Sequence, residues 1–324
     1  MSIRPIRLLG AALAAIVPCL ASAQPGAYPD KPITLMVGYQ PGGSVDLVAR
    51  VIAPSLGKRL GQTIVIENAA GAGGTIAARK VAAAANDGYT LLMGSTSEIG
   101  INHLTQKNPS FVPTRDLLPI GLVGSQPMVL VTGKMNPVGT AGEFIGHLSK
   151  HPGKATYASA GVGTPLHLAG EMVKKKADVF MTHIPYRGAA SMTTDLLGGQ
   201  VDYGVFMLSS ALPYIKDGRM KALGVTSPER NATAPDIPAL AELPALKGLD
   251  ISVLFGVLAP AGTPAAIVGR LRAELNAVVK EPEVRKKLQD AGMALNEDAD
   301  FEKLLKSEIE KFKPIVSFAN IASN

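Results

Sequence analysis

Short β-prone apolar runs alternate with Ala- and Leu-rich segments of helical spacing through most of the chain. Each early run is followed by a turn containing Gly or Ser, and a helical segment comes after the turn. This order predicts parallel βαβ units and therefore an α/β protein. The first units are strands at 33–38, 63–67 and 90–93, with helices at 45–60 and from 71–74 to about residue 85.

A second series of the same kind follows. We expect strands at 128–132, 155–158, 179–184, 202–206, 222–226 and 251–258, and helices at 140–149, 166–176, 189–197, 264–279, 283–291 and 301–319. Residues 227–250 are rich in Pro and are expected to be irregular. No flexible Gly/Ser linker separates the two series.

Two β-prone runs, near 121–128 and near 250–259, are the candidate crossings between two domains. Two crossings make the first domain discontinuous, so we expect it to hold residues 24–125 and 253–324, with the second domain at 126–252. The expected architecture is α/β, with parallel-rich sheets, flanking helices and a two-strand hinge around a ligand cleft. Such a hinge suits closure over a ligand.

Residues 1–23 have the pattern of a secretory signal peptide. Arg4 and Arg7 precede an apolar run, and Ala21-Ser22-Ala23 predicts cleavage after Ala23. A membrane-anchoring helix is the alternative, but about ten apolar residues are too few to span a bilayer. The residues before Cys19 do not fit a lipoprotein signal, so no lipid anchor is expected. The sequence therefore predicts export to the periplasm.

Composition narrows the possible chemistry. Hydrophobic residues make up 47% and charged residues 18% of the chain, which excludes a disordered chain. Once residues 1–23 are removed no Cys remains, so a disulfide, a Cys nucleophile and a Cys metal ligand are excluded. The remaining excess of Lys and Arg is small and forms no basic stripe, so nucleic-acid binding is not expected. The 34 Gly and 24 Pro are about half again their ordinary share, and many stand in the turns.

These turns carry the candidate chemistry. Helices that begin at the carboxyl ends of parallel strands aim free N–H groups at a ligand there. Gly allows close approach of an anion to the backbone, and hydroxyls add hydrogen bonds. The set predicts a small-anion site, although ordinary α/β turn chemistry would explain any single turn. The candidates are Gly42, Gly43, Ser44, Ser95, Thr96, Ser159, Gly161, Gly163, Thr164 and Gly188.

Other motifs are missing from the sequence. Residues 71–74 lack the spacing of a dinucleotide site, and Ser159 has Tyr157 where a nucleophile elbow requires Gly. The five His have no zinc-site spacing, so no metal and no cofactor are expected. His167, in the first turn of a helix beside the loop at 159–164, is a further candidate for ligand binding, and we interpret it as a neutral, hydrogen-bonding residue and not a catalytic one. Arg187 either pairs with a ligand carboxylate or makes a salt bridge within the protein.

The turns also carry a family resemblance. The matching pieces include VGYQPGGSVD at 37–46, GAGG at 71–74, DGYTLL at 87–92, SAGVGT at 159–164, HLAGE at 167–171, PYRG at 185–188, DLLGGQVD at 195–202 and APAGTP at 259–264. As a set these pieces are highly specific and cover nearly the whole mature chain. The chain resembles the periplasmic receptors of tripartite tricarboxylate transporters, the Bug-type solute-binding proteins.

The resemblance implies a two-domain periplasmic-binding fold of type II and a small carboxylate ligand. It implies that the turn at 41–46 and the loop at 159–164 grip the carboxylate through backbone amides and ordered water. Tyr39 takes a position that is usually Phe and lies against the ligand, while Asp46 fixes the turn by capping the helix start. Arg187 and Asp195 stand in matching motifs and complete the expected site.

Two positions depart from the family pattern. Ala69-Ala70 replaces an Arg-Pro pair that often precedes the GAGG segment. Phe206 replaces an Asp that many members carry, and this favours a ligand with an apolar or aromatic body. The alternative is that Phe206 belongs to the core at a strand end.

We therefore expect a non-catalytic, monomeric receptor that captures a small organic acid and delivers it to integral membrane transporter subunits. A sensory role toward a membrane kinase is an alternative that the sequence does not separate from transport. A periplasmic enzyme is a third possibility, and the lack of Cys, of a metal set and of a readable Ser–His–acid arrangement argues against it.

Overall fold

The computed structural model describes residues 28–106, 109–295 and 299–321, so the predicted signal peptide lies outside the described residues. The strands follow the order β2-β1-β3-β9-β4-β7-β5-β6, and β8 pairs with β4. They are β1 (Ile33–Val37), β2 (Ile64–Asn68), β3 (Thr90–Ser95), β4 (Leu117–Gly133), β5 (Thr156–Ser159), β6 (Thr182–Pro185), β7 (Tyr203–Met207), β8 (Met220–Val225) and β9 (Ser252–Pro260).

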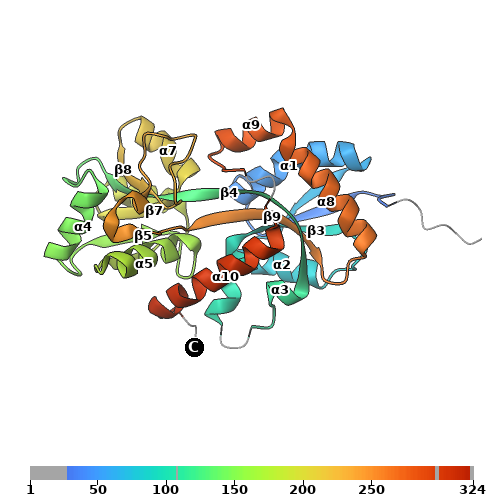
Figure 1. Ribbon diagram of the computed structural model, residues 1–324, viewed down its shortest axis with the longest axis horizontal. Helices are drawn as coiled ribbons and strands as arrows, with labels where there is room; N and C mark the ends of the chain where they lie inside the picture. Colours follow the sequence, from blue (N-terminus) through green and yellow to red (C-terminus); the bar gives the residue numbers. More distant parts are fainter. Residues whose placement is uncertain (1–27, 107–108, 296–298, 322–324) are drawn as a thin grey trace, which may run out of the picture.

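Helices surround this path in two lobes (Figure 1). They are α1 (Ser44–Leu60), α2 (Thr75–Ala82), α3 (Pro113–Asp116), α4 (Ala141–Lys150), α5 (Pro165–Ala177), α6 (Ala189–Leu197), α7 (Leu208–Lys216), α8 (Ala265–Lys280), α9 (Pro282–Asp290) and α10 (Phe301–Phe318). None of the helices in the described part of the chain is long and apolar enough to cross a membrane.

The first lobe contains β1, β2 and β3 with α1, α2, α8 and α9. β1 pairs in parallel with both β2 and β3, and four of its five residues are buried. Strands buried on both faces require helices against them. α1 and α2 both contact β1 and β3, and α8 and α9 pack against α1.

The second lobe contains β5 to β8 with α4 to α7. β5 pairs in parallel with β6 and β7. α5 and α6 pack against β5 and β7, and α7 packs against β4, β7 and β8. The carboxyl ends of β5 and β6 therefore lead into the loops at 159–164 and 185–188, which precede α5 and α6.

Two long antiparallel strands join the lobes. β4 pairs with β9 from Leu117 to Pro127 and then with β7 and β8 from Met128 to Gly133. Figure 1 shows β4 and β9 running side by side between the lobes. Buried Thr226 links them where they diverge, because its hydroxyl accepts from the Met128 amide at 3.0 Å and donates to the Ile251 carbonyl at 2.7 Å. The domain boundaries at 125/126 and 252/253 remain a prediction.

The last helix reaches both lobes. α10 contacts β4 and the segment Ser97–Ile101 of the first lobe, and it packs against α5 of the second. Lys311 of α10 pairs with Asp250 at 2.9 Å. α10 lies along the two crossing strands in Figure 1, so a change in the angle between the lobes would have to move it against one of them.

The sequence analysis did not predict α7 as a helix. Pro213 stands inside it, and a Pro in a helix interior lacks an N–H and is a signal for a break. α7 persists because Leu208 and Ala211 are buried against the sheet of the second lobe. Burial of this apolar face outweighs the missing hydrogen bond.

Helix α5 packs so closely on Tyr157 that residue 170 has to be Gly. A Cβ atom at Gly170 would lie 2.3 Å from Cε2 of Tyr157, whose ring is fully buried. We expect Gly170→Ala to lower the free energy of unfolding by about 1–3 kcal/mol through overpacking. Gly146→Ala in α4, where a Cβ atom meets nothing within 4 Å, should instead raise it by up to about 1 kcal/mol. Urea unfolding of both variants measures the difference, and equal stabilities would contradict the packing argument.

Candidate ligand-binding site

The turn between β1 and α1 is held by Asp46. One carboxylate oxygen, Oδ2, accepts from the Gly42 amide at 2.9 Å and from Nε of Arg50 at 2.8 Å. The other accepts from Nδ2 of Asn68 at 2.9 Å. The Arg50 hydrogen bond, with those from Gly42 and Asn68, lowers the pKa of this buried carboxyl to about 2. Asp46 is therefore ionised and shapes the turn from within.

The first turn of α1 has free amides. Gly43 is the N-cap residue and supplies no side chain, while Leu47 is the first residue whose amide bonds back, to the Gly43 carbonyl at 2.9 Å. Among the described residues, no acceptor takes the amides of Ser44, Val45 and Asp46. Unsatisfied amides at the start of a 17-residue helix carry partial positive charge and attract an anion.

Tyr39 is directed toward a buried acid. Its hydroxyl donates to Oε2 of Glu98 at 2.8 Å and lies 3.1 Å from Oγ of Ser95. Glu98 has no exposed surface and also accepts from the Ser95 amide at 2.6 Å. Burial raises the pKa of Glu98 to about 7. Ser95 and Tyr39 thus provide hydrogen bonds to the buried carboxyl of Glu98. The hydroxyl of Tyr39 is used in this way within the protein.

Thr96 supports the hinge. Its side chain is fully buried, and Oγ1 accepts from the Leu254 amide of β9 at 2.7 Å. The hydroxyl of Thr96 is therefore used within the protein. That Thr96 binds the anion stays a prediction.

The loop Ser159–Thr164, called the anion loop below, satisfies part of its own backbone. The Gly161 amide donates to Oγ of Ser159 at 3.3 Å, and the Gly163 amide donates to Nδ1 of His167 at 3.1 Å. Thr164 caps α5 by accepting from the His167 amide at 3.3 Å. No described residue accepts from the amides of Ala160 and Val162. The glycines therefore shape the loop, and their neighbours hold the free donors.

The loop after β6 contains Tyr186, which has a hydrogen-bond partner, and Arg187, which has none among the described residues. The Tyr186 hydroxyl donates to Asp195 of α6 at 2.7 Å. Arg187 is exposed and makes no hydrogen bond or ion pair with any residue that the structure describes. A salt bridge of Arg187 within the protein thus has no partner in the described ranges. Gly188 precedes α6 as its N-cap residue and supplies no side-chain hydrogen bond.

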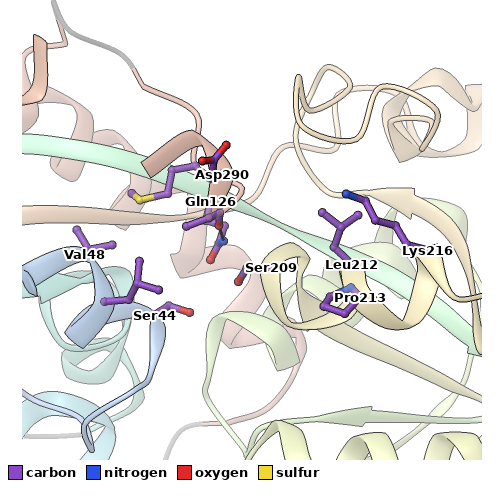
Figure 2. A pocket seen from close by; sticks show the side chains of 11 residues that line it. Ser44, Val48, Gln126, Ser209, Leu212, Pro213, Lys216 and Asp290 are labelled. Atoms are coloured by element: carbon purple, nitrogen blue, oxygen red, sulfur yellow. Dashed lines mark hydrogen bonds between the residues drawn. The ribbon is translucent and has the colours of Figure 1, made fainter. Parts of the chain in front are cut away.

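A pocket of about 450 Å³ lies between the lobes (Figure 2). Ser44 and Val48 of α1 line one side, and Ser209 and Leu212 of α7 line the other. Like α1, α7 begins without a side-chain cap. Gln126 of β4 also lines the pocket. The full lining is Ser44, Leu47, Val48, Gln126, Ser209, Leu212, Pro213, Lys216, Asp290, Ala291 and Met293.

Gln126 has an unused acceptor at this pocket. Its side chain is 2% exposed, and Nε2 donates to the Ala291 carbonyl at 2.5 Å. That bond sets the orientation of the amide and leaves Oε1 with no hydrogen-bond partner among the described residues. A buried polar atom without a partner is costly. Oε1 has essentially no accessible surface, so it faces protein atoms and not the open volume of the pocket.

Phe206 is not at this pocket. It has no exposed surface, stands opposite Val129 in the β4–β7 ladder and packs its ring over Gly204. The interpretation of Phe206 as a ligand contact is therefore corrected. Its alternative, a core residue at a strand end, describes this position.

Sequence reasoning missed Glu98, Gln126, His183 and the α7 residues. His183 was one of four His to which the sequence analysis gave no role, and its Nε2 lies 2.6 Å from Oγ of Ser159. Its position on β6, paired in parallel with β5, was the available signal. Glu98 had none, because an acid three residues after a strand end is ordinarily exposed. Within the described ranges, no group of three or more His, Cys, Asp or Glu could hold a metal ion.

The buried Glu98 makes stability depend on pH. With a pKa near 7 in the folded protein against 4.5 ordinarily, the folded state keeps a proton that the unfolded state releases. The associated stability is full below pH 4.5 and is lost as pH rises through 7. Relative to Glu98→Gln, the wild-type free energy of unfolding should fall by on the order of 3 kcal/mol across that window. Denaturant unfolding from pH 4.5 to 8 measures this, and a pH-independent difference would contradict it.

Comparison with known proteins shows to which family the chain is similar. The family model described as the tripartite tricarboxylate transporter family receptor matches residues 48–321. A protein from the tcbD–tcbE intergenic region of Pseudomonas sp. strain P51 is 35% identical over 311 residues, which covers 95% of this chain and 92% of the relative. "Protein BugT" of Bordetella pertussis is 34% identical and covers 79% of each chain.

Solved structures of similar proteins have the same fold. MatC from Rhodopseudomonas palustris with bound malate is 32% identical with a TM-score of 0.78, and covers 89% of this chain and all of that one. Rpa4515 from R. palustris with adipate is 30% identical with a TM-score of 0.81, over 91% and 99% of the two chains. The predicted fold class is confirmed. The chain belongs to the tripartite tricarboxylate transporter receptor family.

Proposed function

We propose that this protein is a periplasmic receptor that captures a small organic acid between its lobes and delivers it to a membrane transporter. One observation carries the proposal: Ser44, whose amide at the start of α1 has no acceptor among the described residues, lines a pocket of about 450 Å³ between the lobes. Two relatives of the same fold were solved with malate and with adipate, which are both dicarboxylates. The signal peptide at residues 1–23, cleaved after Ala23, and a monomeric state belong to the same proposal.

The binding energy comes from backbone amides. Each charge-assisted N–H bond to a carboxylate contributes about 1.5–3 kcal/mol in a site shielded from water. A ligand held by α1 on one side and by the second lobe on the other is bound fully only when the lobes are closed. Closure then follows from the difference in affinity between the open and closed states.

The pocket walls suggest the shape of the ligand. Val48, Leu212 and Met293 offer apolar surface, so the carbon body of the acid would lie along them. Lys216 at the pocket makes no ion pair with a described residue, which suits a second carboxylate. The favoured class is therefore a short dicarboxylate.

An enzyme is the competing function, because Ser159 and His183 resemble a nucleophile and its base. Their atoms Oγ and Nε2 are 2.6 Å apart. However, Ser159 has no exposed surface, and its hydroxyl also accepts from the Gly161 amide within its own loop. We assign the pair to the architecture of the loop and propose no catalysis. A sensory role with a kinase uses the same binding step and differs only in the partner.

The binding step is tested by calorimetry and thermal unfolding of the mature protein with succinate, malate, adipate, citrate and benzoate. A ligand at 100 times its dissociation constant should add about 2.7 kcal/mol of stability. No response to any of these acids would refute a carboxylate receptor. Mass spectrometry of the purified protein identifies any ligand that is carried through purification.

Ser44→Pro removes one amide donor without changing any charge. Pro is tolerated at the first position of a helix, and Gly43 before it has φ −77° and ψ 170°, a conformation that Pro accepts. We expect Ser44→Pro to fold with wild-type stability and to bind the ligand about 10- to 150-fold more weakly. Ser44→Ala keeps the amide and serves as the control. Equal affinity of both variants would show that this amide does not contact the ligand.

A further inference from the structure

A stacked pair of histidines supports the anion loop of the second lobe. The rings of His167, on α5, and His183, on β6, have centroids 3.9 Å apart and planes inclined by 16°. His167 is 5% exposed and His183 is half-buried. Two imidazoles in such contact cannot both carry a charge without strong repulsion.

Each imidazole bonds a different part of the loop. Nδ1 of His167 accepts from the Gly163 amide at 3.1 Å. Nε2 of His183 lies 2.6 Å from Oγ of Ser159, and that oxygen in turn accepts from the Gly161 amide at 3.3 Å. Both glycine amides are thus held by an imidazole, one directly and one through Ser159.

The bond to Gly163 dictates one protonation state. A ring nitrogen that accepts a hydrogen bond carries no proton, so His167 is neutral and has its proton on Nε2. Protonation of His167 would turn Nδ1 into a donor that faces the donor of Gly163. The loop would then lose a bond and gain a repulsion.

The charged side chains next to the two histidines, Glu171 and Lys174, form an ion pair with each other. Glu171 accepts from Nζ of Lys174 at 2.8 and 2.9 Å and from the Tyr157 hydroxyl at 2.7 Å. Its Oε1 is 3.8 Å from Nε2 of His167. Burial, with Lys174 as a second cause, lowers the pKa of His167 to about 4. Burial and the adjacent His167 lower the pKa of His183 to about 4.

Neighbouring elements contribute charges that are paired elsewhere. α10 packs against α5, and its Lys311 pairs with Asp250 and Glu308. α6 packs against β5, and its Asp195 accepts from Tyr186. Glu171 and Lys174 are therefore the charged groups that act on the imidazoles within the described chain.

We propose that His167 and His183 are positioning residues for ligand binding. As neutral rings they hold the amides of Gly161 and Gly163 within the loop. The amides of Ala160 and Val162, which no described residue accepts, are thereby kept for the carboxylate of the ligand. The ligand part of this role rests on the proposed function, whereas the state of the loop does not.

The state of the loop is measured without ligand. Nitrogen-15 NMR of the imidazoles should show His167 as the Nε2–H tautomer at pH 7. On acidification, the amide signals of Gly161 and Gly163 should shift together with protonation of the histidines, well below pH 6. A His167 with its proton on Nδ1, or histidine titration near pH 6.5 without a change at these amides, would overturn the proposal.

Matched variants test the effect on binding. Asn offers an acceptor near the position of Nδ1 but does not titrate, so His167→Asn should bind adipate or malate within a few-fold of the wild type at pH 7. His167→Leu lacks the acceptor and should bind about tenfold more weakly. Between pH 7 and 3.5, a range that spans the lowered pKa of His167, the wild type should lose affinity relative to His167→Asn, since both proteins see the same ligand titration.

Further variants and measurements distinguish a misfolded variant, a failure of the positioning role and a failure of the proposed function. His183→Gln and His183→Leu form the same comparison at Ser159, and urea unfolding shows whether each variant is folded. Equal affinity of folded His167→Leu and the wild type would overturn the positioning role. If the wild type binds no acid at all, the proposed function fails, and the NMR measurement still decides the state of the loop. If His167→Leu does not fold, His167→Asn and the NMR titration decide.

Discussion

The antiparallel pairing of β4 with β9 is the constraint on which the rest of the structure depends. The chain passes between the lobes in these two strands, and Thr226 ties them together where the ladder ends. Because both strands continue into the sheet of a lobe, any change of the angle between the lobes has to bend them. α1 and α7 begin on opposite sides of this crossing, and their facing surfaces line the pocket between the lobes. The pocket between the lobes therefore depends on how these two strands hold the lobes relative to each other.

The backbone amides of the turn before α1 and of the anion loop fall into two groups. Some are held by acceptors of the protein itself, as Gly42 is by Asp46 and Gly163 is by His167. Others, such as those of Ser44 and Val162, have no acceptor among the described residues. The first group sets the shape of each turn, and the second remains for an anion. A turn with all its amides satisfied would be stable but would have nothing to offer a carboxylate.

Three buried or half-buried titratable residues, Glu98, His167 and His183, lie close to the turns and carry a partial charge or none near neutral pH. In the first lobe, burial raises the pKa of Glu98 to about 7, so this acid is partly protonated near neutral pH. In the second lobe, burial keeps His167 and His183 uncharged. An anionic ligand therefore meets oriented dipoles more than full charges. Such groups need little reorganisation, and the positive ends of the helices supply the attraction.

The order of strands, turns and helices is a local property, and the sequence by itself determined most of it. Periodicity and turn residues located α1 and α5 within a few residues, and the glycine-rich turns marked the loops at 42–44 and 159–164. α7 escaped this reasoning because Pro213 is a local signal against a helix, whereas the burial that maintains α7 comes from the distant strands β4, β7 and β8.

What each side chain does was decided by the tertiary structure. Phe206 and Thr96 stand beside turns in the sequence, yet packing buries Phe206 in the core and directs the hydroxyl of Thr96 to a backbone amide of β9. Glu98 and His183 have no local signature, and they matter because distant segments fold over them. The sequence located the turns at the helix starts, but which of their amides stay free depends on acceptors such as Asp46 and His167, which hold the amides of Gly42 and Gly163. Burial, pairing and protonation depend on neighbours that are close in space and far apart along the chain, and so only the folded structure sets them.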